Sequence, residues 1–414
     1  MSVRVSASKA PVIAPDGPAS AIGRARRAVL ADRYQANSLA VEWRELSELQ
    51  PIAGEWGELA ARALEPNVFY EPAFLLAAAP VFARDAGAML VWSGSVPRRL
   101  LGFFPARRQR RRYGVDLPIL LGLTHPYGPL GVPLVEREAP EPVIAAWLAK
   151  LAADRSTPAL LLLPSLPPNG PFAAALEAIV RRAHMPTADF NRHQRALLAP
   201  NGERALYVEQ TLGQHQHKEL RRHWRRLSET GAVLFTVAKE PAAVAAALDD
   251  FFALEAAGWK GRAGTASADH DELRSFTRAA VIGLAAEGKA WLNRILVDGS
   301  AIAAAIVLRS GRQAWFWKIA FDESFARFSP GVMLSVALTD ELLEEPTIER
   351  TDSCASADHP MIDHLWRERL AMGDRLVAVR PQARFWLAKS LARLRSAAIT
   401  GVKKMSIGLR SRRR

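Results

Sequence analysis

The segment Leu254–Gly331 constrains the fold of this chain more than any other part of the sequence. It holds three short apolar runs separated by Asp298-Gly299 and Ser310-Gly311, and residue pairs of this kind favour tight turns between antiparallel strands. An apolar helical pattern over Pro241–Ala257 leads into it, and Ser329-Pro330-Gly331 has the composition of a helix start. We therefore predict a helix, a three-stranded meander and a second helix within a mixed α/β fold.

The helix predicted over Pro241–Ala257 carries a carboxylate on its apolar face. Glu255 follows Phe251 by four positions, which places both side chains on one face. Burial there would raise the pKa of Glu255 and suit a general base, whereas a position at the edge of the face would let it reach Lys260. Trp259 and Lys260 begin the next loop. Together they would bind a charged ligand by stacking and ion pairing. Alternatively, Trp259 would pack into the core and Lys260 would remain in solvent.

The third apolar run, Gln313–Phe321, is predicted to be a strand with two distinct faces. Strict alternation places Trp317 and Ile319 on one face and Lys318 and Asp322 on the other. Lys318 and Asp322 would then point the same way. Either would contact a substrate or remain a surface charge.

Ser329-Pro330-Gly331 is the sharpest local signal for ligand binding. Ser is a favoured N-cap and Pro a favoured first helical residue, and Gly331 would leave the first amides of the helix uncovered. Such amides bind anions, so a diphosphate would fit here, with Arg327 beside it. Taken alone, most helix starts of this kind bind nothing.

The residues after Asp352 combine acidic and histidine side chains without the spacing of a metal site. His359 and His364 are five positions apart, and a spacing of four would be needed to place two ligands on one helical face. We therefore expect no metal. Cys354 is the only cysteine; we expect it to be a buried small residue rather than a nucleophile.

A strongly basic helix is predicted over Tyr207–Thr230. Leu220, Trp224 and Leu227 form an apolar stripe, and cations occupy most of the remaining surface. One interpretation is a solvated helix that bridges two domains. The other places some of its arginines near a phosphate-bearing ligand.

The net charge of +13 comes from the ends of the chain. Residues 1–33 carry +4 and residues 384–414 carry +10, which leaves −1 for residues 34–383. A near-neutral centre argues against nucleic-acid binding, and basic ends favour anionic surfaces such as inner-leaflet lipid. No secretory signal or apolar run of about 20 residues is recognised, so we expect a cytoplasmic protein.

Several of these motifs together resemble a known family. They are Phe252-x-Leu254-Glu255-x-x-Gly258-Trp259-Lys260-Gly261, Trp317-Lys318-x-Ala320-Phe321-Asp322, Phe328-Ser329-Pro330-Gly331, Asp352 and Asp358-His359. In combination they resemble the acetyltransferase domain of the GNAT superfamily, nearest to the branch linked to cellulose and exopolysaccharide biosynthesis. The Fem-type peptidoglycan aminoacyltransferases are more distantly similar.

The resemblance implies two tandem GNAT-like α/β units. We expect a disordered leader at 1–38, an N-terminal GNAT-like domain at 39–204, a C-terminal acetyltransferase domain at 205–380 and a basic amphipathic tail at 381–414. The tandem arrangement agrees with a length of 414 residues, which exceeds one typical core.

The resemblance also implies the reaction and the residues that serve it. The donor would be acetyl-CoA or another acyl-CoA, and the strand Gln313–Phe321 would separate from its neighbour to receive the thioester. Glu255 is the first candidate for the base and Asp322 the second. The cofactor-binding candidates are Ile319, Ala320, Arg327, Ser329, Gly331 and Val332, and the substrate-binding candidates are Trp259, Lys260, Lys318 and His359.

The resulting hypothesis is a cytoplasmic acyl-CoA-dependent N- or O-acyltransferase. Its acceptor would be a saccharide or an amine in cell-surface polysaccharide biosynthesis, with peripheral membrane contact through the C-terminal tail. The alternative is a non-catalytic GNAT-like interaction protein that docks to the inner membrane through its basic tails.

Overall fold

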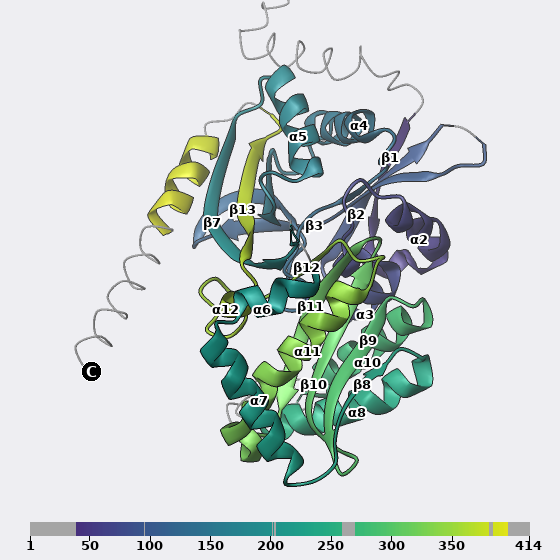
Figure 1. The fold of residues 1–414 in the computed structure, drawn as a ribbon. Coiled ribbons are helices and arrows are strands. Elements are labelled where there is room, and N and C mark those ends of the chain that lie inside the picture. Colours follow the sequence, from purple (N-terminus) through teal and green to yellow (C-terminus); the bar gives the residue numbers. More distant parts are fainter. Residues whose placement is uncertain are drawn as a thin grey trace, which may run out of the picture.

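The computed structural model describes residues 39–94, 96–200, 202, 204–258, 270–380 and 384–395. Their centre is one mixed sheet of 13 strands in the order β1-β2-β3-β4-β6-β13-β7-β12-β11-β10-β9-β8, with β5 paired to β3 (Figure 1). The predicted mixed α/β class is confirmed. No helix within these ranges is long and apolar enough to cross a membrane.

The first half of the chain forms an α/β unit with helices on both sides of its strands. Its elements are β1 (Leu39–Glu45), α2 (Ala53–Ala61), α3 (Pro72–Phe82), β2 (Ala86–Ser93), β3 (Leu100–Arg112), β4 (Val115–Gly122), β5 (Leu134–Val135), α4 (Pro140–Ala153), β6 (Leu160–Leu166), α5 (Pro171–Arg182) and β7 (Thr187–Leu198).

The second half begins with two helices and then repeats the same order of elements. These are α6 (Tyr207–Thr211), α7 (Gln214–Ser228), β8 (Val233–Ala238), α8 (Pro241–Ala257), α10 (Asp271–Ala286), β9 (Ala290–Val297), β10 (Ser300–Ser310), β11 (Gln313–Phe321), the 3-10 helix η7 (Glu323–Phe328), α11 (Pro330–Glu344), β12 (Arg350–Asp352), α12 (Ile362–Leu365) and β13 (Glu368–Ala378). Residues 384–395 form a further helix.

Apart from the short β5, each half has the same order of elements. A strand is followed by two helices and three strands, and then by a helix, a strand, a helix and a last strand. The halves exchange their last strands, because β13 lies between β6 and β7 while β7 pairs with β12. Both halves thus share one sheet. The domain boundary near residue 204 remains a prediction. β13 belongs to the second half in sequence but lies among the strands of the first half.

The predicted helix over Tyr207–Thr230 is two helices. The chain leaves the helical conformation at Leu212 and Gly213, where α6 ends and α7 begins. Glycine has a high entropic cost inside a helix, which favours a break at this position. α7 contacts η7 and so lies against the second half of the molecule instead of bridging the two halves (Figure 1).

The predicted alternation of β11 holds through Trp317 and is wrong from Lys318 onward. Ile306 of β10 faces Lys318 and Val307 faces Phe316, so Trp317 is an extra residue that forms a β-bulge. A bulge changes the direction of the side chains that follow it. Trp317 joins the core cluster that contains Phe251 of α8, and Ile319 packs on the opposite cluster beneath α11.

Candidate functional site

A cavity of about 360 Å³ opens where β11 separates from β12. β12 pairs with β11 only from Gln313 to Trp315 and ends at Asp352, whereas β11 continues to Phe321. The predicted separation of these strands is therefore present in the structure. We call this space the strand-gap cavity; it is lined by Pro126, Tyr127, Pro129, Glu255, Phe316, Trp317, Lys318, Ile319, Ser353, Cys354, Ala355, His359, Met361 and Ile362.

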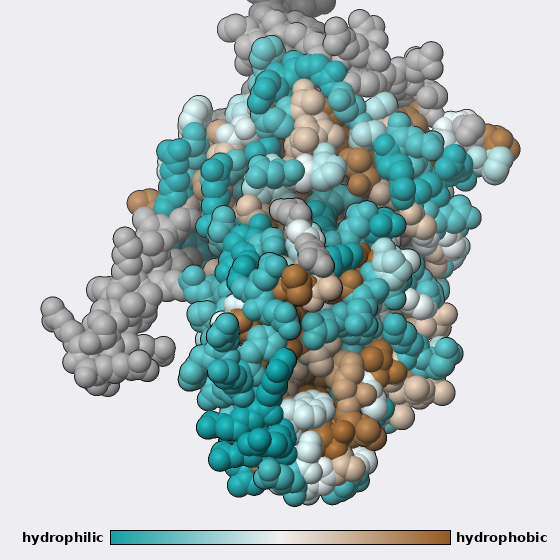
Figure 2. Space-filling view, viewed as in Figure 1, coloured by the Kyte–Doolittle hydropathy of each residue, from teal (hydrophilic) through white to brown (hydrophobic). Residues whose placement is uncertain are grey.

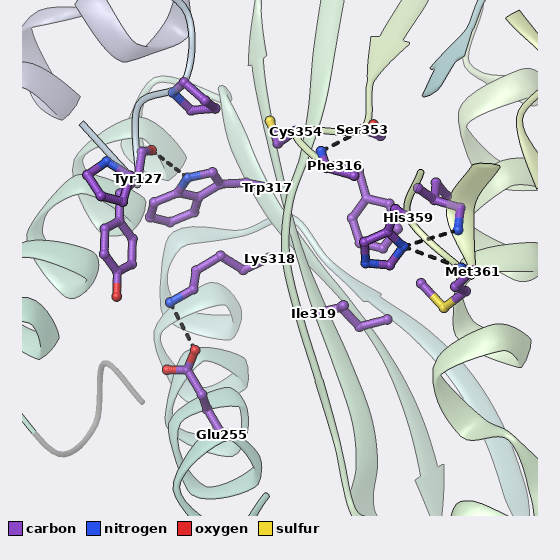
Figure 3. Close-up of a pocket in the computed structure, with 14 residues that line it drawn as sticks. Tyr127, Glu255, Phe316, Trp317, Lys318, Ile319, Ser353, Cys354, His359 and Met361 are labelled. Carbon is purple, nitrogen blue, oxygen red and sulfur yellow. Dashed lines mark hydrogen bonds and ion pairs between the residues drawn. The ribbon is translucent and has the colours of Figure 1, made fainter. Parts of the chain in front are cut away.

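One side of the strand-gap cavity contains a buried ion pair. The Lys318 ammonium lies 3.0 Å from a carboxylate oxygen of Glu255, and their side chains are 9% and 1% exposed. Figure 3 shows the two side chains meeting between β11 and α8. The bulge at Trp317 turns Lys318 toward α8, so Lys318 meets Glu255 on the side of β11 that also holds Trp317. The pairing supplies the opposite charge that a buried carboxylate requires.

Tyr127, from the first half of the chain, completes this side. Its carbonyl oxygen accepts a hydrogen bond of 2.8 Å from the Trp317 indole, and its ring lies 4.6 Å from the Lys318 ammonium (Figure 3). Burial, reinforced by the negative charge of Glu255, raises the pKa of Tyr127. The phenol is therefore neutral near pH 7 and able to donate a hydrogen bond.

His359 lies on the opposite side of β11, beside Ile319 and Met361 (Figure 3). Its Nδ1 accepts hydrogen bonds from the backbone N–H groups of Met361 and Ile362 at 3.3 and 3.4 Å. A neutral imidazole whose Nδ1 accepts carries its proton on Nε2. His359 is thus oriented by the start of α12 and can serve as a hydrogen-bond donor.

A second buried ion pair supports the wall of the cavity. Arg195 of β7 pairs with Asp352 at the end of β12, and both side chains are almost fully buried. Arg195 also donates to the carbonyl of Pro129, and Asp352 accepts from the backbone N–H of Cys354. Burial, with the neighbouring Asp352 charge, raises the pKa of the Cys354 thiol, which does not suit a nucleophile.

A second cavity, of about 270 Å³, lies between α7 and the start of α11. We call it the helix-side cavity; it is lined by Leu212, Gln216, Glu219, Leu220, His223, Ser329, Val332, Val336, Pro360, Met361, His364 and Leu365. Met361 lines both cavities. The candidates Ser329 and Val332 are thus brought close to the strand-gap cavity.

The physical reason given for Gly331 requires correction. Gly331 is buried, and a Cβ at this position would lie 3.1 Å from the Phe321 ring. Its lack of a side chain therefore serves packing and does not uncover the helix start. Ser329 is the N-cap residue in a left-handed conformation, but its side chain makes no capping bond; its carbonyl accepts from the Val332 N–H at 3.0 Å.

Other candidates lie away from the two cavities. Asp322 accepts from the Ser324 N–H and caps η7; Arg327 is exposed, with its guanidinium 4.7 Å from the Phe328 ring centre. Ala320 is buried in the cluster below α8. Trp259 and Lys260 lie outside the described residues. Within the described ranges, no group of His, Cys, Asp and Glu side chains could hold a metal ion.

Sequence reasoning missed Tyr127 and Arg195. Tyr127 lies in a loop of the first half, and Arg195 is 157 positions from its partner Asp352. No local spacing connects such distant residues. β7 contains two arginines, Arg192 and Arg195, and nothing in its local pattern shows which of them has a buried partner.

One family model matches part of the second half of the chain. Residues 214–359 match the family described as the acetyltransferase (GNAT) domain. Both Glu255 and His359 lie within the matched residues. No curated protein matches the sequence.

Two solved structures share the fold over most of the chain. One is the C-terminal domain of a putative lysylphosphatidylglycerol synthetase from Agrobacterium fabrum, with 12% identity, coverage of 84% of this chain and 95% of that one, and a TM-score of 0.52. The other is FemX, with 10% identity, coverage of 81% and 98%, and a TM-score of 0.54. At these identities the likeness shows the fold alone, and it spans both halves of the chain.

Proposed function

We propose that this protein is an acyl-CoA-dependent N- or O-acyltransferase whose acceptor is a saccharide or amine in cell-surface polysaccharide biosynthesis. The observation that carries the proposal is the strand-gap cavity, which has residues of both β11 faces in its lining and is lined mostly by residues that match the GNAT domain. The polysaccharide acceptor and a cytoplasmic location rest on the sequence resemblance and composition.

The two sides of β11 suit the two substrates. Ile319, His359 and Met361 lie toward α11, where the acyl donor would enter past Ser329. Glu255, Lys318 and Tyr127 lie toward α8, where the acceptor would bind. The acyl carbon would then lie in the gap between β11 and β12, within reach of both groups of residues.

In the proposed reaction, Glu255 accepts the proton of the acceptor N–H or O–H as the acceptor atom bonds to the acyl carbon. The acyl–sulfur bond breaks, and the thiolate leaves with the electron pair. Tyr127 lines the same side of the cavity, and its neutral hydroxyl would donate a proton or a hydrogen bond there. Lys318 positions the Glu255 carboxylate through their 3.0 Å contact.

The test is calorimetric titration with acetyl-CoA and longer acyl-CoAs, followed by detection of released CoA thiol with amino sugars and cellulose-derived oligosaccharides. Glu255→Gln should retain thioester binding and lose transfer at least ~100-fold. Glu349→Gln, at an exposed carboxylate, is the matched control and should transfer normally. Absence of binding by every thioester tested would contradict the proposal, and full activity of Glu255→Gln would exclude it as the base.

Membrane docking without catalysis is the second candidate function, and the helix at 384–395 favours it. Trp386, Leu387 and Leu394 are 62%, 43% and 68% exposed, while Phe385 packs into a core cluster with residues of β4, β6, β7 and β13. Exposed apolar side chains among cations are typical of helices that lie at a lipid surface. Flotation with anionic vesicles should be lost when residues 384–414 are removed; unchanged flotation would refute docking through this helix.

A further inference from the structure

α7 forms one wall of the helix-side cavity, opposite the start of α11. Gln216, Glu219, Leu220 and His223 of α7 line this cavity. The Nδ1 atom of His223 is buried and has no hydrogen-bond partner among the described residues. Buried polar atoms are normally hydrogen-bonded, so a molecule in this cavity is one source of the missing partner.

The rest of α7 is unusually cationic for a helix with so little burial. Leu227 is its only buried residue, and its five cations, all exposed, are Lys218, Arg221, Arg222, Arg225 and Arg226. Within the described part of the chain, Arg222 alone among them forms an ion pair, at 3.9 Å with Glu219. Figure 2 shows the strongly hydrophilic surface that α7 forms at the lower left.

The positive charge of α7 destabilises the helix unless an anion offsets it. Five cations within nine positions repel one another along the helix, and α7 has little apolar burial to compensate. By contrast, the buried Arg195 has a carboxylate partner, Asp352. The charge therefore indicates an anionic partner that is not found among the described residues.

We propose that α7 binds the phosphate groups of the acyl donor, with Arg222 and Arg226 as the contacting cations. This deepens the proposed function and rests on it. Arg222 and Arg226 follow Glu219 by three and seven positions, so they share the helix stripe that borders the cavity. Lys218 and Arg225 lie on the opposite stripe, away from Leu220 and His223.

The proposal places the two ends of one donor in the two cavities. The phosphate-bearing end lies between α7 and the Ser329 start of α11, and the acyl end passes Met361 into the strand-gap cavity. Glu219 is the one acidic side chain in the lining of the helix-side cavity. Arg222 offsets its charge through their ion pair.

The experiment compares two charge-matched double variants of the full-length protein. Arg222→Gln/Arg226→Gln alters the stripe beside the cavity, and Lys218→Gln/Arg225→Gln removes the same charge from the opposite stripe of the same helix. Glutamine has nearly the helix propensity of lysine and arginine, so circular dichroism should match the unmodified protein. Each protein is titrated with CoA, 3′-dephospho-CoA and pantetheine.

For Arg222→Gln/Arg226→Gln we expect the Kd for CoA to rise ~3- to 30-fold, with a smaller rise for 3′-dephospho-CoA and none for pantetheine. The Lys218→Gln/Arg225→Gln control should change each Kd less than ~2-fold. Equal CoA affinity in the two variants would overturn the α7 assignment while leaving the proposed function intact.

Two further results separate the proposals. If the unmodified protein binds neither CoA nor pantetheine, the proposed function fails and the α7 assignment fails with it. If it binds transfer RNA tightly and with strong salt dependence but does not bind CoA, the cations of α7 serve nucleic acid and both proposals are overturned.

Discussion

Lys318→Met would leave the Glu255 carboxylate, whose side chain is 1% exposed, without the ammonium that lies 3.0 Å from it. Removing one partner of a buried ion pair typically costs about 3–5 kcal/mol, because a charge stays in a poorly hydrated place. Since whole domains are stable by only about 5–15 kcal/mol, the urea midpoint of unfolding should fall sharply. The assay is urea unfolding followed by tryptophan fluorescence and circular dichroism.

Replacing the other partner of the ion pair, in Glu255→Gln, should reduce the free energy of unfolding by less. In Glu255→Gln the amide can still bond to Lys318, and the ammonium keeps its positions 4.6 Å from the Tyr127 ring and 5.6 Å from the Phe251 ring. We expect a loss of about 1–2 kcal/mol. The double variant should recover most of the Lys318→Met loss, because no carboxylate is then left without the ammonium of Lys318.

Arg312→Gln is the control for charge removal alone. Arg312 pairs with Glu349 at 2.5 Å, but their side chains are 61% and 63% exposed, so the expected cost is at most about 1 kcal/mol. If Lys318→Met costs no more than Arg312→Gln, the Glu255–Lys318 pair is not the buried contact described here and the reasoning fails.

Three further predictions concern single residues. Burial lowers the pKa of His125 from 6.5 to about 4, so stability should be full above pH 6.5 and fall by about 3 kcal/mol toward pH 4; His125→Asn should remove this pH dependence in urea titrations. Gly331→Ala should cost about 1–3 kcal/mol in thermal unfolding through contact with Phe321, and a normal Tm with weaker CoA binding would contradict the packing role. Arg195→Met should cost about 3–5 kcal/mol by leaving Asp352 unpaired, and recovery in Arg195→Met/Asp352→Asn, measured by urea unfolding, checks the cause.

Local periodicity was sufficient to place Glu255 on a buried helical face, because α8 has a regular pattern and spacings of four residues share a face. The same reasoning failed for β11. The bulge at Trp317 depends on the register with β10, so no pattern within β11 reveals it. Strict alternation placed Lys318 on the face opposite Trp317, whereas in the structure both side chains lie on the side of α8.

Local sequence patterns could not predict which residues of the first half reach the cavity. Tyr127 reaches the cavity because the two halves share one sheet and exchange their final strands. Arg195 reaches Asp352 for the same reason, since β7 pairs with β12. Strand exchange between two similar units is a tertiary property, and the hydrophobic pattern of each strand is compatible with either arrangement.

The central claim is that an acyl-CoA binds across the gap between β11 and β12. A crystal structure of the protein soaked with CoA tests it most directly. The account predicts the CoA thiol in the strand-gap cavity near Ile319 and His359, and the phosphate groups between α7 and Ser329. CoA bound at another surface, or no CoA density at millimolar concentration, would contradict the claim.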